Sequence, residues 1–343
     1  TLADALRLEG ADCTFICRDQ IGHLVDLIRE RGHQVMMLAA SDSVLTNASH
    51  ENLAHAAWLG TDWATDANDS QQAMGSRTVD WLVVDHYALD HRWEKAMRPF
   101  TQKIMVIDDL ADRAHDCDLL IDQNLGRSVE DYRSLVPDHA KKLIGPRYAL
   151  LRPEFSAMRE KSLARRQDPQ LKHLLITLGG VDKDNLTGEV LQTLRICNLP
   201  LDLHITVVMG PHAPWLQNVQ DIATAMPRPT QVKVSVRDMA SLMTDSDLVI
   251  GAAGGTAWEC CSLGLPSLVI TAAENQRSTA HALKQNGAAL LIESARDIAT
   301  YIENPLPSDT LAQRLKHLSS AAATITDGNG LALVLQELKL PHV

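Results

Sequence analysis

A glycine-rich turn between a predicted strand and a predicted helix offers the clearest chemistry in this sequence. It lies in the stretch Asp247–Glu259, DLVIGAAGGTAWE, where an apolar run meets Gly254, Gly255 and Thr256 before a helical continuation. Such a junction exposes backbone N–H groups at a helix N-terminus, where a phosphate can approach without meeting side chains. The spacing matches neither the P-loop nor the GxGxxG fingerprint. Taken alone, the stretch is therefore equally consistent with a tight turn that binds nothing.

Other predicted strands of the C-terminal half also end in glycine or polar residues. In a parallel sheet all these strand ends lie at one edge, where open α/β sheets bind ligands. A carboxylate and a carboxamide at that edge, Glu259 and Asn275, suit ribose hydroxyls and a uracil edge, although a surface helix residue and a helix cap are the alternative interpretations. The residues expected at this edge are Gly179, Gly180, Gly210, Gly254, Gly255, Thr256, Glu259, Asn275 and Gln276.

A second polar cluster follows the predicted buried strand 81–84 in the N-terminal half. Asp85, His86 and Tyr87 stand at its carboxyl end, the position at which parallel sheets present reactive groups. For His86 alone, a hydrogen-bonded structural role is as good an interpretation as catalysis. Asp108 and Asp109 follow the next strand, but no further ligand at suitable spacing completes a metal site, so a capping or loop role is favoured.

Composition narrows the class of protein. The chain has 343 residues, which predicts two domains, and 43 acidic against 32 basic residues give a formal charge of −11. The absence of a basic block with interleaved aromatic residues argues against nucleic acid as a partner. No run approaches the roughly 18 apolar residues of a membrane span, so we expect a cytoplasmic protein. The six cysteines form no CxxC pair and predict reduced, buried thiols rather than a zinc site or disulfides.

Two series of alternating strands and helices predict two doubly wound, Rossmann-like α/β domains with parallel sheets. We expect an N-terminal domain over residues 1–155, a charged linker over 156–171, and a C-terminal domain over 172–343 that ends in two helices packing back across the domains. Such domains face each other across a cleft that can hold a nucleotide. The expected strands are 13–18, 35–39, 81–84, 103–107 and 117–121, then 174–178, 203–209, 232–236, 248–250, 268–270 and 289–292.

The chain resembles the UDP-2,4-diacetamido-2,4,6-trideoxy-β-L-altropyranose hydrolases of pseudaminic acid biosynthesis, a route to flagellin glycosylation, which are similar to GT-B glycosyltransferases of the MurG type. The resemblance spans about residues 12–290. It rests on VDHYALDHRWE (84–94), IDDLADRAHDCDLLIDQN (107–124), GPRYALLRPEF (145–155), ITLGGVDKDN (176–185), and GAAGGTAWECCSLGLPSLVI with ENQ (251–270, 274–276).

This resemblance implies a metal-independent and cofactor-independent hydrolase, a monomer whose partner is a UDP-sugar. Water attacks the anomeric carbon with inversion, and UDP leaves. The enzyme must activate that water and hold the developing diphosphate charge. By matching motif positions, the glycine turn with Thr256 cradles phosphate, Glu259 and Asn275 take the ribose and uracil, and Gly179 and Gly180 line the opposite wall. Asp85, His86 and Tyr87 face the sugar, with Tyr87 the strongest of the three.

One departure from the family affects the catalytic assignment. The family's general base is a histidine in a Gly-His-x-x-Arg loop that precedes the helix beginning here at Thr1, and no residue of this chain matches it. Gly22 and His23 imitate the dipeptide, but they follow the strand 13–18 and are followed by Asp26 in place of arginine. We therefore expect either a missing first strand, loop and half-helix or a poorly active homologue. A MurG-like transferase and a non-catalytic nucleotide-sugar binding protein are the alternative functions.

Overall fold

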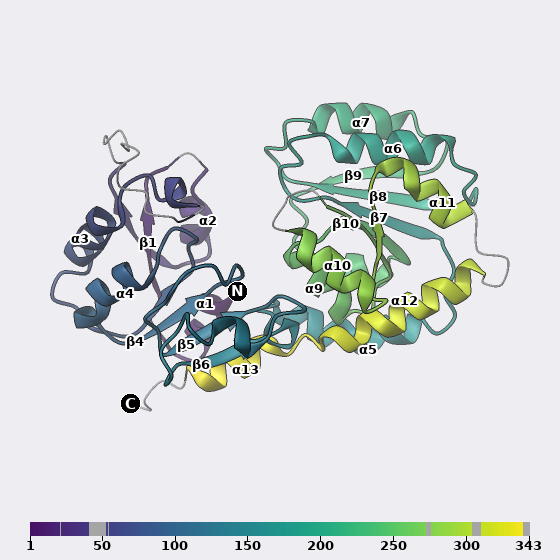
Figure 1. The fold of residues 1–343 in the computed structure, drawn as a ribbon. Helices are drawn as coiled ribbons and strands as arrows, with labels where there is room; N and C mark the ends of the chain where they lie inside the picture. The colour runs from purple at the N-terminus through teal and green to yellow at the C-terminus, as the bar shows by residue number, and fades with distance from the viewer. Residues whose placement is uncertain (21, 41–52, 54, 272–275, 304–309, 339–343) are drawn as a thin grey trace. The chain divides into compact units, whose positions relative to one another are not determined.

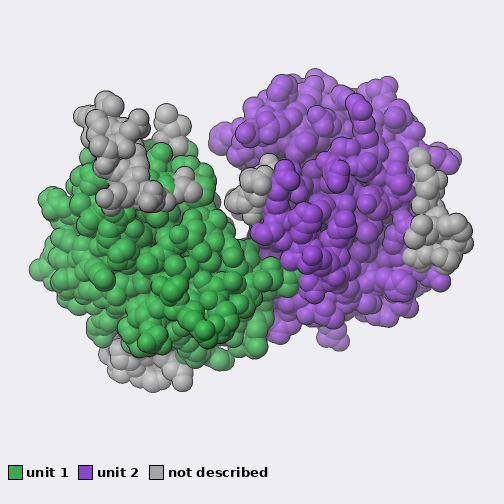
Figure 2. Space-filling model, in the orientation of Figure 1, with its two compact units in different colours: residues 1–150, 332–343 green, residues 151–331 purple. Residues whose placement is uncertain are grey.

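The computed structural model describes the chain except for residues 21, 41–52, 54, 272–275, 304–309 and 339–343 (Figure 1). It contains two compact units (Figure 2). Unit 1 comprises residues 1–150 with 332–343, and unit 2 comprises residues 151–331. No helix of the described residues is long and apolar enough to cross a membrane.

Unit 1 is built on parallel strands in two sheets, a pair in the order β1-β2 and a four-stranded sheet in the order β3-β4-β5-β6. The central strands β4 and β5 are buried on both faces, which is typical of parallel sheets covered on each side. The strands are β1 (Thr14–Arg18), β2 (Gln34–Leu38), β3 (Val79–Val84), β4 (Thr101–Ile107), β5 (Leu119–Asp122) and β6 (Lys141–Ile144). The α-helices are α1 (Leu2–Leu8), α2 (Val25–Glu30), α3 (Trp63–Met74), α4 (His91–Met97) and α13 (Gly330–Glu337), and the 3₁₀ turns are η1 (Ala56–Leu59), η2 (Arg98–Phe100), η3 (Val129–Tyr132) and η4 (Pro146–Tyr148).

Unit 2 is built on one six-stranded parallel sheet in the order β12-β11-β10-β7-β8-β9. Figure 1 shows α6 and α7 on one face of this sheet and α9 and α10 on the other. The strands are β7 (His173–Thr177), β8 (His204–Met209), β9 (Thr230–Val234), β10 (Leu248–Ala252), β11 (Ser267–Ile270) and β12 (Leu290–Ile292). The helices are α5 (Pro153–Arg165), α6 (Leu186–Ile196), α7 (Leu216–Thr224), α8 (Met239–Asp245), α9 (Gly255–Ser262), α10 (Arg277–Gln285), α11 (Ile298–Glu303) and α12 (Leu311–Ile325), with the 3₁₀ turn η6 (Ala295–Asp297).

The strand order of unit 2 reverses between β7 and β10. The chain moves outward from β7 through β8 to β9, returns to pair β10 with the other side of β7, and then continues through β11 to β12. In open parallel sheets a crevice forms outside the carboxyl ends of the two strands where the order reverses. The glycine-bearing ends of β7 and β10 therefore lie side by side at the ligand-binding edge of this sheet.

The expected strands are confirmed to within about two residues at each end, and their parallel pairing is confirmed as well. The strand β6 was not expected, because its sequence KKLI is short and half of it is lysine. The helix α3 was not expected either. Its acidic sequence resembles a surface stretch, yet Asp66 and Ser70 are buried in it, and Asp66 accepts hydrogen bonds from Arg18 and Trp93.

The structure divides the chain differently from the expected boundaries at 155, 171 and 343. Most of the expected linker, 156–171, is the helix α5, whose basic residues bind inside unit 2: Arg159 donates hydrogen bonds to carbonyl oxygens at the ends of α9 and α12. Basic side chains satisfy carbonyl groups that a helix end leaves without partners. At the other end of the chain, residues 332–343 belong to unit 1, because Val334 and Leu338 pack against Met105, Leu119 and Ile121.

Arg166 is the buried anchor of α5, and its removal is expected to destabilise unit 2. Its guanidinium donates to the carbonyl oxygens of Ser162 at 2.9 Å and of Met243 and Ser246 at 3.0 Å. Arg166→Met leaves these buried acceptors without a donor, so we expect a loss of about 2–4 kcal/mol in the free energy of unfolding, measured in urea. The matched control is Arg165→Met, which breaks the more exposed ion pair with Asp247 and should cost about 0–1 kcal/mol. Equal losses in the two variants would contradict this assignment.

Candidate functional site

The first turn of α9 is open to a ligand. Gly254 is its N-cap residue and provides no side-chain acceptor. The N–H of Ala257 donates to the Gly254 carbonyl oxygen at 2.9 Å, but no described residue accepts a hydrogen bond from the N–H of Gly255 or Thr256. Gly255 is exposed, and a Cβ atom added to it would meet no atom within 4 Å. Thr256 adds a hydroxyl group in the same turn. The helix dipole and these free donors together make this turn suited to an anion.

The first turn of α6, in contrast, is already filled by the protein's own side chains. The Asp182 carboxylate accepts hydrogen bonds from the N–H groups of Leu186 and Thr187, both at 2.9 Å, and Asn185 caps the N–H of Gly188 at 3.3 Å. Both capping residues adopt left-handed backbone conformations, with φ of 42° for Asp182 and 58° for Asn185. Since a carboxylate occupies this helix end, α9 is better suited than α6 to accept an anion, and its predicted role as a phosphate site stays a prediction.

Glycines bring the ends of β7 and β8 into contact. The N–H of Gly210 donates to the carbonyl oxygen of Gly180 at 3.1 Å, and a Cβ atom on Gly210 would lie 2.2 Å from that oxygen. Any larger residue at position 210 would force the two loops apart. Gly179 has a φ of 103°, which only glycine adopts without strain. These glycines shape the edge of the site beside the anion-binding turn.

Glu259 lies one helical turn beyond the open end of α9 and is held by Arg152. The guanidinium of Arg152 lies 3.7 Å from Glu259 Oε1 and 3.1 Å from the Glu154 carboxylate, and it donates to the carbonyl oxygen of Arg237. Burial raises the pKa of Glu259, and the positive charge of Arg152 partly opposes that rise. Arg152 was not among the predicted site residues, although it lies in the segment 145–155, one of those that carry the family resemblance.

Gln276 lies beside the glycine turn, because its side-chain nitrogen is 3.6 Å from the position that a Cβ atom on Gly254 would take. It is also the N-cap residue of α10. Asn275 lies outside the described residues, so its predicted role in binding ribose or uracil stays a prediction. The part of the strand-end cluster that the structure describes is therefore gathered at one edge of one sheet.

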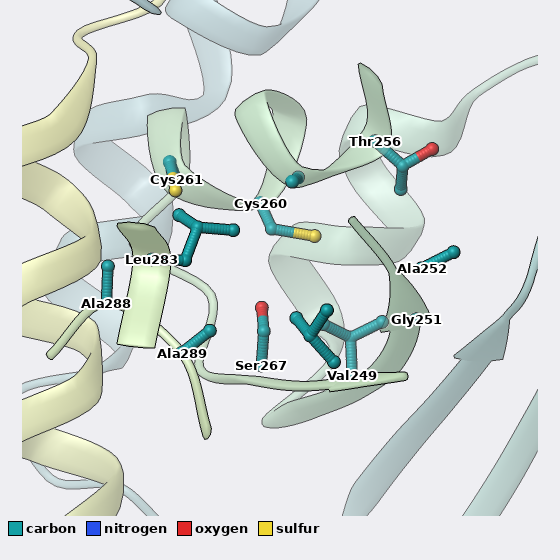
Figure 3. A pocket seen from close by; sticks show the side chains of 12 residues that line it. Val249, Gly251, Ala252, Thr256, Cys260, Cys261, Ser267, Leu283, Ala288 and Ala289 are labelled. Atoms are coloured by element: carbon teal, nitrogen blue, oxygen red, sulfur yellow. The ribbon is translucent and has the colours of Figure 1, made fainter. Parts of the chain in front are cut away.

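A small pocket lies behind the glycine turn, between α9, α10 and the strands β10 and β11 (Figure 3). Its lining is mostly apolar, and in Figure 3 the hydroxyl oxygen of Thr256 points away from its centre. Burial raises the pKa of the Cys260 thiol to about 12, so this lining group stays neutral near pH 7. Because the pocket contains no charged group, we assign the anion site to the open side of the turn.

In unit 1, the cluster predicted at the end of β3 is completed by a residue from β4's end. Tyr87 donates a hydrogen bond from its hydroxyl to Asp109 Oδ2 at 2.8 Å. Burial and the Asp109 carboxylate raise the pKa of Tyr87, so the phenol keeps its proton. Asp85 is exposed, yet desolvation by the surrounding protein and repulsion from Asp109 raise its pKa.

His86 has one of its two ring nitrogens occupied. The backbone N–H of Ala88 donates to His86 Nδ1 at 3.1 Å. Burial lowers the pKa of His86, and the charge of Arg113 lowers it further. With Nδ1 accepting in a neutral ring, the proton is on Nε2, which leaves His86 a hydrogen-bond donor toward any ligand.

A buried network supports this cluster from beneath. The hydroxyl of Tyr132 lies 2.9 Å from Asp108 Oδ2 and 2.8 Å from Asp122 Oδ2. Burial is the largest single effect and opposes ionisation of Asp108. Arg113, at 2.8 Å, acts together with the Ala111 N–H, His115 and the Tyr132 hydroxyl, and their sum lowers the pKa of Asp108. Burial raises the pKa of Asp122 to about 6. One phenolic proton cannot serve two ionised carboxylates, so Asp122 completes the network as a donor only below about pH 6; at higher pH the guanidinium of Arg127, 3.5 Å away, partly balances its charge.

The sequence analysis expected a capping or loop role for the aspartates after β4. This is confirmed for Asp108, which accepts a hydrogen bond from the N–H of Ala111. Asp109 has a further role as the partner of Tyr87. In the part of the chain that the structure describes, no group of three or more His, Cys, Asp or Glu side chains is arranged to hold a metal ion. Asp122 and Tyr132 were missed, although Asp122 follows a predicted strand as Asp85 and Asp108 do.

The chain is similar to several known proteins. Residues 173–327 match the glycosyltransferase family 28 C-terminal domain. The chain is 28% identical to the uncharacterized protein MJ1062 of Methanocaldococcus jannaschii, over 62% of this chain and 44% of that protein. It is also 28% identical to the spore coat polysaccharide biosynthesis protein SpsG of Bacillus subtilis, over 57% of this chain and 58% of that protein.

A third relative is the UDP-2,4-diacetamido-2,4,6-trideoxy-β-L-altropyranose hydrolase of Campylobacter jejuni, 28% identical over 60% of this chain and 71% of that protein. The match therefore spans about half the length of the first two relatives and more of the third. Among solved structures, MurG of Acinetobacter baumannii superposes with a TM-score of 0.66 at 15% identity, over 98% of this chain and 93% of that one. The protein has an α/β GT-B fold with two parallel-sheet, Rossmann-like domains, and its C-terminal domain is similar to family 28.

The buried Asp122 is expected to make stability depend on pH. Its folded pKa of about 6 lies above the usual aspartate pKa of 3.8, so the folded state binds the proton more tightly and loses stability as pH rises through about 6. That loss amounts to about 2–3 kcal/mol between about pH 4 and pH 7. Asp122→Asn keeps an acceptor for the N–H of Asn124 and should abolish this part of the decline in urea unfolding. A carboxyl titration of Asp122 by NMR with its midpoint below about pH 4.5 would contradict the assignment.

Proposed function

We propose that this protein is a UDP-sugar hydrolase that releases UDP from a 2,4-diacetamido-2,4,6-trideoxy sugar. The observation that carries the proposal is the open first turn of α9, an anion site at the carboxyl edge of the sheet in unit 2. The resemblance of the sequence to the altropyranose hydrolases, and the 28% identity to the Campylobacter jejuni enzyme, support the choice of reaction and substrate.

In this proposal the diphosphate binds at Gly254, Gly255 and Thr256. Negative charge develops on the leaving UDP as the bond from the anomeric carbon to the phosphate oxygen breaks. Fixed N–H donors and a helix dipole aimed at that charge stabilise the transition state without reorganisation. Glu259 accepts hydrogen bonds from ribose hydroxyls, and the positive charge of Arg152 favours the ionised form of its carboxylate. Gln276 and the predicted Asn275 take the remaining polar edge of the nucleoside.

The residues of unit 1 then act on the sugar and the attacking water. His86 donates through Nε2 and Tyr87 is a fixed phenol, so neither accepts a proton in the state observed. Asp85 is the exposed carboxylate of the cluster, and its raised pKa makes it a better base. Water forms a bond to the anomeric carbon, its proton passes to Asp85, and the bonding electron pair leaves with UDP. Among the described residues of this cluster, Asp85 is the exposed carboxylate, and it is the base we assign.

The match to a glycosyltransferase domain favours a second candidate, a MurG-like UDP-sugar transferase. The two functions differ in the acceptor, which is water for the hydrolase and a lipid or glycan hydroxyl for the transferase. Proton NMR of the UDP-linked diacetamido sugar with the protein and EDTA tests the choice. Release of free sugar without an added acceptor supports the hydrolase. Turnover only with an added acceptor supports the transferase, and UDP binding without turnover supports a non-catalytic binding protein.

The anion site predicts a selective effect of Gly255→Ala. The added methyl group meets no protein atom, so we expect the free energy of unfolding to change by less than about 0.5 kcal/mol. The same methyl stands where the phosphate approaches, and UDP affinity measured by calorimetry should fall about tenfold. Uridine, which lacks phosphate, is the control ligand and should bind both proteins equally. An equal loss of affinity for UDP and uridine would place the phosphates elsewhere.

The base assignment predicts a pH profile. Asp85 must be ionised to accept a proton, so kcat/KM should fall as pH drops through its raised pKa. Asp85→Asn should lower kcat by about 10² to 10⁴ and remove that acid limb, while UDP affinity is retained. The comparison variant is Asp80→Asn, a change of the same kind within β3, the strand that Asp85 follows, and it should leave the rate unchanged. An unaltered acid limb in Asp85→Asn would exclude Asp85 as the base.

A further inference from the structure

Three aromatic rings meet beside the polar cluster of unit 1. His55 and Trp58 have ring centroids 4.5 Å apart, His55 and Tyr87 are 5.3 Å apart, and Trp58 and Tyr87 are 5.6 Å apart in an edge-to-face arrangement. Trp58 belongs to the 3₁₀ turn η1, whereas Tyr87 follows β3. We refer to His55, Trp58 and Tyr87 as the aromatic triad. Each ring of the triad contacts the other two, so the three side chains hold one another in place.

Trp58 in this triad is 56% exposed. Trp93 and Trp258 are each only 5% exposed and pack in the cores of their units. Trp215 is also exposed, at 41%, but its indole N–H is fixed by the carbonyl oxygen of Lys183 at 2.8 Å. Among the described residues, none accepts a hydrogen bond from the indole of Trp58. Its ring face therefore contributes little to the core, although an aromatic face is a large apolar surface.

Hydrogen-bonding groups border this exposed ring on one side. Tyr87 is both a member of the triad and the hydrogen-bond donor to Asp109. Asp85 lies two residues before Tyr87, directly after the strand β3. An apolar ring face beside fixed polar groups matches one class of small ligand, a pyranose ring. One face of such a ring carries C–H groups that pack on an aromatic surface, and its edge carries hydroxyl or acetamido groups that form hydrogen bonds.

We propose that the aromatic triad is a stacking platform for the sugar ring of the nucleotide sugar. This inference rests on the proposed function and deepens it by assigning sugar recognition to Trp58. The platform holds the pyranose by its apolar face, while Tyr87 and Asp85 meet its polar edge and the attacking water. Since the proposed function assigns the nucleoside and the phosphates to residues of unit 2, Trp58 should contribute to the affinity for the UDP-sugar and not to the affinity for UDP.

The test compares two ligands, UDP and UDP-2,4-diacetamido-2,4,6-trideoxy-β-L-altropyranose, by calorimetry in an Asp85→Asn background that prevents turnover. Trp58→Ala should weaken binding of the UDP-sugar about tenfold, because it removes the apolar surface against which the C–H face of the pyranose packs, and leave UDP binding unchanged. Trp58→Phe keeps a ring and should restore most of the affinity. Trp215→Phe, the other exposed tryptophan, is the matched control and should not distinguish the two ligands. Tryptophan fluorescence should change on adding the UDP-sugar in every protein that retains Trp58 and lose most of that change in Trp58→Phe.

Each outcome decides the proposal. If Trp58→Ala and its parent bind the UDP-sugar with equal affinity, the platform is overturned. The proposed function still stands in that case, provided that the parent protein binds UDP. Equal losses of affinity for the UDP-sugar and for UDP would also overturn the platform, because they would indicate that Trp58 contacts the uracil or has a structural role. Absence of UDP binding in the parent protein would overturn the proposed function itself, and the platform with it. Urea unfolding of Trp58→Ala should show only a small loss relative to its parent, because the ring is 56% exposed and its contacts are with His55 and Tyr87.

Discussion

Parallel strand pairing is the constraint on which both units depend. Every strand pair formed by the described residues is parallel, so the carboxyl ends within each sheet meet at a single edge. In unit 2 this edge carries the glycine turns after β7, β8 and β10, and in unit 1 it carries the aspartates after β3, β4 and β5. Residues far apart in the chain are brought together because the sheet leaves them no other edge.

Within that frame, the way each helix end is satisfied decides which turn is free to bind. Asp182 and Asn185 supply oxygen acceptors to the first turn of α6, so the protein's own side chains compensate the dipole of that helix. Glycine at the N-cap of α9 supplies none. Among the described residues, none accepts a hydrogen bond from the N–H of Gly255 or Thr256, and this helix end lies at the strand-order reversal, which is why we propose it as the anion site. Neighbouring glycines extend this by letting two loops approach within hydrogen-bonding distance.

Unit 1 solves a different electrostatic problem, that of several carboxyl groups at one edge. Asp108 is neutralised by Arg113, and Asp122 shares the phenol of Tyr132, so the inner pair is buried without an uncompensated charge. The outer pair, Asp85 and Asp109, has less compensation, and each has a raised pKa. One set of aspartates therefore provides both a buried, compensated pair and a more reactive outer pair. The difference between the two pairs is set by which cations and hydrogen-bond donors each carboxyl group contacts.

The sequence by itself determined the two-domain α/β fold, most of the strands and the residues at their ends, because apolar runs and glycine turns report local burial and backbone geometry. It also placed Gly254, Gly255 and the Asp85-His86-Tyr87 cluster at sheet edges. Only the tertiary structure decided which side chains meet: Tyr87 with Asp109, Arg152 with Glu259, and Trp58 with Tyr87. Only the structure showed that the charged stretch 156–171 is mostly the helix α5. Such contacts depend on strand register and on distance between elements, and no periodicity within one segment records either.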